Sequence, residues 1–194
     1  MSPTPTTGVG VLEDPLAGLA EVSSAGMTNF NRINSGGTYS PGYYPRGIQL
    51  SNGTATLQPG VYYIGSSQQN NRGLRMTGNS SLQGTGVLLF LAGNQSAQIG
   101  GRAQLNLSPP LDGEYAGLCI FQARGNAVEF SVSGRSATTI SGGIYTPAAH
   151  VAIGGTSTGS TGRIIAKTLE VDQNSVWTVD PIFVQGQAST LIVR

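Results

Sequence analysis

Short apolar runs separated by glycine and polar residues fill most of this chain, and the longest unbroken run is Val87–Leu91, directly after Gly86. An apolar run of this length, bounded by turn residues, is typical of a strand that is buried on both faces. The same form, a glycine followed by large apolar residues, recurs along the chain. The glycines that head these runs are Gly42, Gly60, Gly86, Gly117, Gly143 and, with one polar residue inserted, Gly162.

The spacing of these six glycines indicates a structural repeat. Successive glycines are 18, 26, 31, 26 and 19 residues apart, and repeats of elastic length are typical of solenoids, in which corner insertions leave the stacking unchanged. Each interval also contains two or three short strand-like segments that end at turn residues, such as Gly78 and Asn79. Parallel stacking would pair the backbone groups of every interior strand. The sequence therefore predicts an all-β fold, a right-handed parallel β-helix (solenoid) of about six coils.

The chain is predicted to be one domain behind a short linker. Residues 1–13 are rich in Pro and Thr, as linkers are, and residues 14–194 form the predicted β-helix domain. An Asp-Pro pair favours a short capping helix at the start of this domain. This helix would belong to an N-terminal cap, residues 14–37, that lies over the open end of the solenoid.

The last residues are too apolar for a free tail, and residues 181–194 are predicted to supply closing strands. An apolar strand left uncovered at a sheet edge promotes pairing with another chain. We therefore expect an assembly edge, and self-association through it, at Leu191, Ile192 and Val193.

Composition and charge narrow the class of protein. Charged residues make up only 10% of the chain and the net charge is +1, with no basic stripe, so nucleic acid is an unexpected partner. The single cysteine, Cys119, lies in an apolar run and is expected to be buried. The chain has no apolar run long enough to cross a bilayer and no signal peptide at its start. It is either cytoplasmic or, as the linker-like start favours, an excised piece of a longer exported protein.

Several short motifs, in order along the chain, are similar to the C-terminal region of TadG-like pilus-assembly proteins of bacteria. They are Asp14–Ala17, Leu57–Ile64, Gly84–Val87, Gly117–Gln122 and Gly143–Pro147. The resemblance implies an extracytoplasmic domain, at the cell surface or in the periplasm, behind an N-terminal membrane anchor that is outside this sequence. It also implies pilus or envelope proteins as partners, and it brings no catalytic residues with it.

Residues that carry chemistry are dispersed. Carbohydrate-cleaving β-helices need clustered carboxylates for acid–base work or for calcium, but the close pair Asp112 and Glu114 falls in a turn, where Asp has a local hydrogen-bonding role. His150, the sole histidine, has no acidic or cysteine neighbour in sequence. The sequence therefore predicts no catalytic residue, no metal site and no cofactor, and the chain is not expected to be an enzyme.

Tyrosines flank the recurrent strands and are candidate ligand-facing aromatics. Two interpretations stay open: the rings stack as part of the structure, or they form a face that packs against saccharides. Adjacent residues on a strand point to opposite sides, so Tyr62 and Tyr63 cannot both be in the core. The candidates are Tyr43, Tyr44, Tyr62, Tyr63 and Tyr145.

The sequence therefore favours a non-catalytic structural or adhesive module of a bacterial cell-surface or pilus-associated protein. The alternative is a β-helix that binds or cleaves carbohydrates, with surface glycans as ligands. An ice-binding solenoid ranks third, because such faces carry regular Thr-x-Thr rows. Here Thr54 and Thr56 form an isolated pair, and the other threonines do not recur at the interval of the repeat.

Overall fold

The computed structural model describes residues 13–65, 73–172 and 174–180, and these residues form strands, turns and irregular chain without any helix. The all-β prediction is confirmed. The predicted capping helix at the Asp-Pro pair is wrong: Asp14 instead starts a turn, in which its Oδ1 accepts a hydrogen bond from the Leu16 amide at 2.9 Å. Most of the predicted linker and all of the predicted closing strands, including Leu191, Ile192 and Val193, lie outside the described residues.

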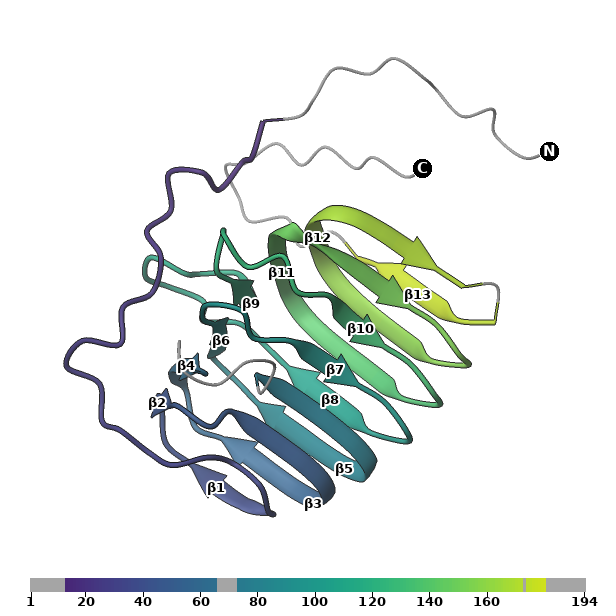
Figure 1. The fold of residues 1–194 in the computed structure, drawn as a ribbon, viewed down its shortest axis with the longest axis horizontal. Helices are drawn as coiled ribbons and strands as arrows, with labels where there is room; N and C mark the ends of the chain where they lie inside the picture. Colours follow the sequence, from purple (N-terminus) through teal and green to yellow (C-terminus); the bar gives the residue numbers. More distant parts are fainter. Residues whose placement is uncertain (1–12, 66–72, 173, 181–194) are drawn as a thin grey trace.

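The described part of the chain contains thirteen strands. They are β1 (Gly37–Tyr39), β2 (Gly42–Tyr44), β3 (Ile48–Leu57), β4 (Gly60–Ile64), β5 (Leu74–Gly84), β6 (Val87–Leu91), β7 (Ala97–Ile99), β8 (Gln104–Leu107), β9 (Leu118–Gln122), β10 (Phe130–Val132), β11 (Ala137–Ile153), β12 (Thr158–Val171) and β13 (Val176–Val179). Every pair between these strands is parallel, and successive parts of the chain lie side by side from β1 to β13 (Figure 1).

The sheet closes on itself through five strands. β5 pairs with β7 near its start and with β8 near its end, while β11 pairs with β8 near its start and with β10 near its end. Because β7 also pairs with β10, the hydrogen-bonded circuit is complete. The result is a closed five-stranded parallel barrel, β5-β7-β10-β11-β8, with the remaining strands added to it.

This topology corrects the prediction of a right-handed parallel β-helix of about six coils. The sequence suggested separate short strands divided by turns at glycine. In the structure Gly78 and Asn79 lie inside β5, and Gly142 and Gly143 lie inside β11. Strands of 11 and 17 residues therefore continue where breaks were predicted, and each is long enough to pair with a different strand at either end.

Glycines stack at the bend that follows the short strands. Gly101 and Gly134 have φ of 68° and 72°, in the left-handed region that favours glycine. Serines two residues after such bends fix the turn: the Ser136 hydroxyl donates to the Ser133 carbonyl at 2.8 Å, and Ser157 donates to the Gly154 carbonyl at 2.8 Å. The bends at Gly134 and Gly155 thus each satisfy a buried hydroxyl locally, and the second is packed directly on the first.

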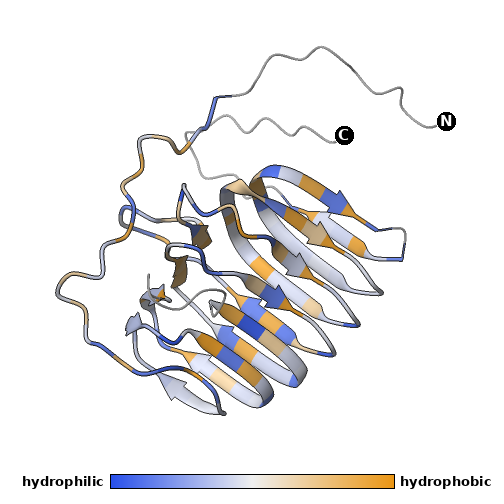
Figure 2. Cartoon of the chain, viewed as in Figure 1, coloured by the Kyte–Doolittle hydropathy of each residue, from blue (hydrophilic) through white to orange (hydrophobic). Residues whose placement is uncertain are grey.

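Two apolar clusters hold the strands together. The larger one fills the interior and includes Leu50, Leu82, Leu105 and Ile140. The smaller one lies on the outer side of β4, β6 and β9, where Leu88, Phe90 and Phe121 are covered by the N-terminal segment, residues 13–30. β6 and β9 are the most uniformly apolar strands in Figure 2, because they are buried on both faces.

Candidate binding face and groove

A row of uncharged polar side chains crosses seven strands in register. β1, β3, β5, β8, β11, β12 and β13 each contribute one residue. Side chains alternate across a sheet, and the residues that flank Thr56, Ala55 and Leu57, are buried, so the row points outward. We call this row the polar ladder, and its members are Thr38, Thr56, Gln83, Asn106, Thr139, Ser160 and Thr178.

A second outward row runs beside the polar ladder, two residues earlier on each strand. Its members are Thr54, Ser81, Gln104, Ala137, Thr158 and Val176. Neither row contains a charged residue. Neighbouring strands are about 4.8 Å apart and alternate residues on a strand roughly 6.6 Å apart, so the two rows form a regular array. We call the two rows together the ladder face.

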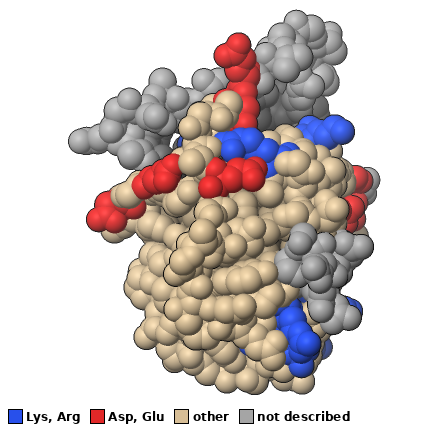
Figure 3. Space-filling view, turned by 60° about the vertical axis from the view of Figure 1, so that its left-hand side comes forward, with Lys and Arg blue, Asp and Glu red and all other residues tan. Residues whose placement is uncertain are grey.

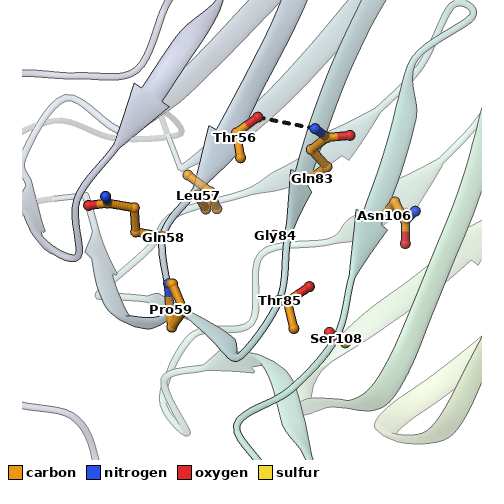
Figure 4. A pocket seen from close by; sticks show the side chains of 9 residues that line it. All are labelled: Thr56, Leu57, Gln58, Pro59, Gln83, Gly84, Thr85, Asn106 and Ser108. Atoms are coloured by element: carbon orange, nitrogen blue, oxygen red, sulfur yellow. Dashed lines mark hydrogen bonds between the residues drawn. The ribbon is translucent and has the colours of Figure 1, made fainter.

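A groove lies at one edge of the ladder face, across β3, β5 and β8. It has a volume of about 440 Å3 and is lined by Thr56, Leu57, Gln58, Pro59, Gln83, Gly84, Thr85, Asn106 and Ser108. Figure 4 shows Thr56, Gln83 and Asn106 on three neighbouring strands, with Pro59, Thr85 and Ser108 along the lower edge.

Gly84 lines this groove at an inward-facing position of β5. It is in register with the buried residues Leu57 and Leu107. A Cβ at Gly84 would lie 2.8 Å from Val87 Cγ2 and 3.0 Å from Leu57 Cβ, too close for an ordinary contact. Glycine at position 84 therefore lets β5 pass close to Leu57 and Val87, where a side chain would not fit.

The polar groups of the groove keep much of their hydrogen-bonding capacity. Gln83 Nε2 donates to Thr56 Oγ1 at 3.1 Å, and Ser40 Oγ donates to Gln58 Oε1 at 2.8 Å. The side-chain amide of Asn106 has no hydrogen-bond partner among the described residues. An amide carries two donors and an acceptor with two lone pairs, so Gln83, Gln58 and Asn106 can each bind a further polar group. None of the nine lining residues is titratable, so the groove offers hydrogen bonding and not proton transfer.

Three of the five candidate ligand-facing tyrosines are in the core. Tyr44, Tyr62 and Tyr145 are at most 1% exposed. Tyr44 stacks on Tyr62 at a centroid distance of 5.7 Å, and the Tyr44 hydroxyl donates to the Ser40 carbonyl at 2.6 Å. Burial raises the pKa of Tyr44 to about 12. These three rings are not accessible to a ligand in this structure, and they have a packing role.

Tyr43 and Tyr63 are half-buried and belong to an in-register aromatic row. The row continues along β6, β9 and β11, and consecutive rings are 4.8–5.4 Å apart. Its members are Tyr43, Tyr63, Phe90, Phe121 and Tyr145. Residues of the N-terminal segment, among them Leu16, Leu19 and Met27, pack on the cluster that contains most of this row. A ligand-facing role for Tyr43 and Tyr63 stays a prediction.

Arg124 connects the N-terminal segment to the aromatic row through hydrogen bonds and a ring contact. Its Nη2 donates to the carbonyls of Leu16 and Leu19, both at 2.6 Å, and its backbone amide donates to Glu21 Oε1 at 2.6 Å. The guanidinium lies 5.6 Å from the centroid of the Phe121 ring. In Figure 3 the acidic side chains gather in the upper part of the view, with basic ones among them, and most of the remaining surface is uncharged.

Other residues with reactive side chains do not line the groove. His150 Nε2 lies 3.5 Å from Glu170 Oε2, and His150 Nδ1 is hydrogen-bonded to Thr168 Oγ1 at 2.7 Å. Asp112 and Glu114 are exposed in a turn. Cys119 is fully buried, and burial raises its pKa to about 12, so it is a poor nucleophile. Over residues 13–65, 73–172 and 174–180, no group of three or more His, Cys, Asp or Glu side chains is arranged to hold a metal ion.

Sequence reasoning missed the polar ladder. It noted Thr54 and Thr56 but not that Thr56 pairs with Gln83 and Thr139 with Asn106. The threonines were predicted not to recur at the interval of the repeat. This prediction is wrong in part, because four of the seven residues of the polar ladder are threonine. The signal was the polar–apolar–polar triplet around each of Ala55, Leu82 and Leu105, which marks an outward pair even when the residue types differ.

Comparison with known proteins gives no relative: no family model, no curated protein and no solved structure matches this chain. In the part of the chain that the structure describes, no helix is long and apolar enough to span a membrane.

Proposed function

We propose that this chain is a non-catalytic structural or adhesive module of a bacterial cell-surface or pilus-associated protein, and that it contacts its partner through the ladder face. The resemblance of its motifs to TadG-like pilus-assembly proteins supports an extracytoplasmic location with pilus or envelope proteins as neighbours. The ladder face is the surface that this proposal assigns to the contact.

The ladder face is the observation that carries this proposal. Its two regular rows contain no charged residue, and all but Ala137 and Val176 carry uncharged polar groups. Contact with a partner therefore removes no charge of the ladder face from water, which would be costly. The rows are held by strand-to-strand hydrogen bonds, so their backbone is already ordered before binding and little ordering entropy opposes contact. A regular array of many weakly bonding groups suits attachment to an extended surface.

The other outward surfaces are less suited to this role. The aromatic row is covered by the N-terminal segment. A further outward row crosses β3, β5, β7, β10, β11 and β12, and it contains both a cation and an anion. Its members are Gln49, Arg75, Gln98, Ser131, Ala152 and Glu170. This row, which we call the charged row, provides a matched internal control for substitutions on the ladder face.

Attachment assays test the proposal. Beads coated with the chain are mixed with surface preparations of bacteria that carry tight-adherence pili, and attached material is measured for wild type, Gln104→Arg and Gln98→Arg. Both glutamines are exposed and outward-facing, but Gln104 is on the ladder face and Gln98 in the charged row. We expect Gln104→Arg to lose attachment about tenfold and Gln98→Arg to keep it. Equal effects of the two changes would contradict the proposal.

A turnover assay tests the non-catalytic part. The wild-type chain is incubated with neutral and acidic polysaccharides, and new reducing ends are measured. We expect no release above a buffer control. Reproducible release by the purified chain would show that it cleaves carbohydrate, and the non-catalytic proposal would then be wrong.

A further inference from the structure

We propose that the groove across β3, β5 and β8 binds a chain of an uncharged saccharide. This inference rests on the proposed adhesive function and names the class of partner that the ladder face recognises. It assigns sugar recognition to hydroxyl and amide groups, in place of the tyrosines that the sequence suggested.

The chemistry of the lining residues matches a neutral sugar. Each saccharide hydroxyl both donates and accepts hydrogen bonds, as do the side chains of Thr56, Gln83 and Asn106. Gln83 Oε1 and Gln58 Nε2 remain available after the two internal hydrogen bonds of the groove, and the whole Asn106 amide remains available among the described residues. The exposed ring of Pro59 adds an apolar surface for the C–H groups of a sugar.

The charge of the lining selects against acidic ligands. Carboxylate and phosphate groups are bound strongly by arginine or lysine, which form charge-assisted hydrogen bonds. None of the nine lining residues is charged. An acidic polysaccharide would therefore lose hydration of its charges on entering the groove without gaining an ion pair.

The register of the strands favours a polymer over a single sugar. Thr56, Gln83 and Asn106 are successive ladder positions, each about 4.8 Å from the next. Beyond the groove, the polar ladder continues on β11 through Thr139, which is exposed. A longer chain can therefore contact more ladder residues than a short one, and its affinity should rise with chain length because the additional contacts are made within one complex.

The test is a titration by affinity electrophoresis and calorimetry. The probes are dextran, laminarin, xyloglucan and chitohexaose as neutral glycans, and alginate and polygalacturonate as acidic ones. The variants are Gln83→Ala and Gln83→Glu, with Gln98→Ala and Gln98→Glu as matched controls on the charged row. Circular dichroism and thermal unfolding confirm that each variant is folded.

We expect wild type to bind at least one neutral glycan, with affinity that increases with chain length, and to bind neither acidic glycan. Gln83→Ala should weaken binding about tenfold, through the lost hydrogen bonds, and Gln83→Glu by at least as much. The Gln98 variants should bind like wild type. Binding to none of the neutral glycans, binding to the acidic glycans alone, or equal affinity of the Gln83 variants and wild type would overturn the inference.

The attachment assay separates this inference from the proposed function. If no neutral glycan binds but Gln104→Arg still weakens attachment about tenfold, the saccharide is the wrong partner and the adhesive role stands. If a glycan binds through Gln83 but the chain attaches to no surface preparation, the groove assignment stands and the adhesive role fails. Selective incorporation of wild type into growing ice, without glycan binding, would also overturn the saccharide inference, because ice offers the same neutral hydrogen-bonding chemistry.

Discussion

Gly134 lies directly over Gly101: a Cβ added to Gly134 would stand 2.7 Å from the carbonyl oxygen of Gly101. The same relationship recurs one bend further along, where a Cβ on Gly155 would stand 2.6 Å from the carbonyl oxygen of Gly134. Backbone packs on backbone at these bends, so no side chain can move aside to relieve a contact. The spacing of the strands is therefore set partly by residues without side chains.

Replacement of Gly134 by alanine should destabilise the chain by about 2 kcal/mol or more. The change combines a φ of 72°, which is unfavourable for alanine, with the contact to Gly101. Gly93→Ala separates the two causes, because Gly93 has a φ of 53° but open space around it. Only the unfavourable φ acts there, so we expect this variant to be destabilised by about 1 kcal/mol. Denaturant unfolding at equilibrium measures the free energies.

Gly125→Ala is the control for this series. A Cβ at Gly125 would meet no atom within 4 Å, and its φ is not in the left-handed region. Its free energy of unfolding should stay within about 0.5 kcal/mol of wild type. If Gly134→Ala lowers the free energy of unfolding no more than Gly93→Ala does, the stacked bends can move apart to accept the added methyl group.

Arg124→Met should release the N-terminal segment from the aromatic row while the sheet stays folded. The substitution removes the two hydrogen bonds to the Leu16 and Leu19 carbonyls and the contact with the Phe121 ring. Amide hydrogen exchange should become about tenfold faster in residues 16–30, while exchange in β6 and β9 is changed less. Arg135→Met is the control, because Arg135 is exposed at a bend. Exchange in residues 16–30 that is the same in both variants would show that apolar packing alone holds the segment.

Stability should fall as the pH rises from about 10 to 12. Burial raises the pKa of Tyr44 and of Tyr145 to about 12 from an ordinary value of 10. Between these pH values the unfolded chain loses protons that the folded chain keeps, so the free energy of unfolding decreases with pH. The stabilisation is complete below pH 10 and is lost as the pH approaches the raised pKa.

Denaturant titrations at pH 9, 10 and 11 measure this decrease. Tyr145→Phe should make the decrease with pH smaller, because one of the buried phenols no longer titrates. The substitution also removes the hydrogen bond from the Tyr145 hydroxyl to Asp14 Oδ2, so its stability at pH 9 is the reference for its own series. A free energy of unfolding that is constant from pH 9 to 11 would contradict the burial of these hydroxyls.

The pairing of the glycine-headed apolar runs is the part of the fold that could be predicted from the sequence. Gly60–Ile64 pairs with β6 in register along its whole length, and β6 pairs with β9, as their common form suggested. A buried run is recognisable because both of its faces are apolar. Opposite orientations of Tyr62 and Tyr63 followed from the alternation of side chains alone, and the structure confirms them.

The closure of the sheet and the ladder face were not predictable from those runs. Gly78 has a φ of 60° inside β5, and nothing in the local sequence distinguishes a glycine that bends a continuous strand from one that ends it. The partner of Thr56 depends on the length of chain between Thr56 and Gln83, and that length changes from one step of the ladder to the next. The register between neighbouring strands depends on how the bends pack. A row made of different residue types can therefore be recognised only after the structure has aligned the strands.

The path of the N-terminal segment also needed the structure. A cap over the end of the sheet, residues 14–37, was expected. Asn29 and Ile33 do form parallel bridges to Tyr43 of β2 and Ile48 of β3. Leu16 and Leu19 lie instead along the side where the aromatic row is, and Arg124, more than 100 positions later in the chain, donates hydrogen bonds to their carbonyls. Contacts over such a separation depend on the arrangement of all the strands between them. No local pattern around Leu16 or Arg124 encodes this pairing.

Side-chain amide resonances give the most direct test of the ladder face as the binding surface. In 1H–15N spectra of the labelled chain, the amide groups of Gln83, Gln104 and Asn106 report on the ladder face, and those of Gln49 and Gln98 report on the charged row. On addition of the neutral glycan that binds best, or of the surface preparation if no glycan binds, we predict shifts or broadening at Gln83, Gln104 and Asn106, and at Gln58 where the glycan enters the groove, but not at Gln49 and Gln98. Changes at Gln49 and Gln98 with the three ladder amides unaltered would contradict the account.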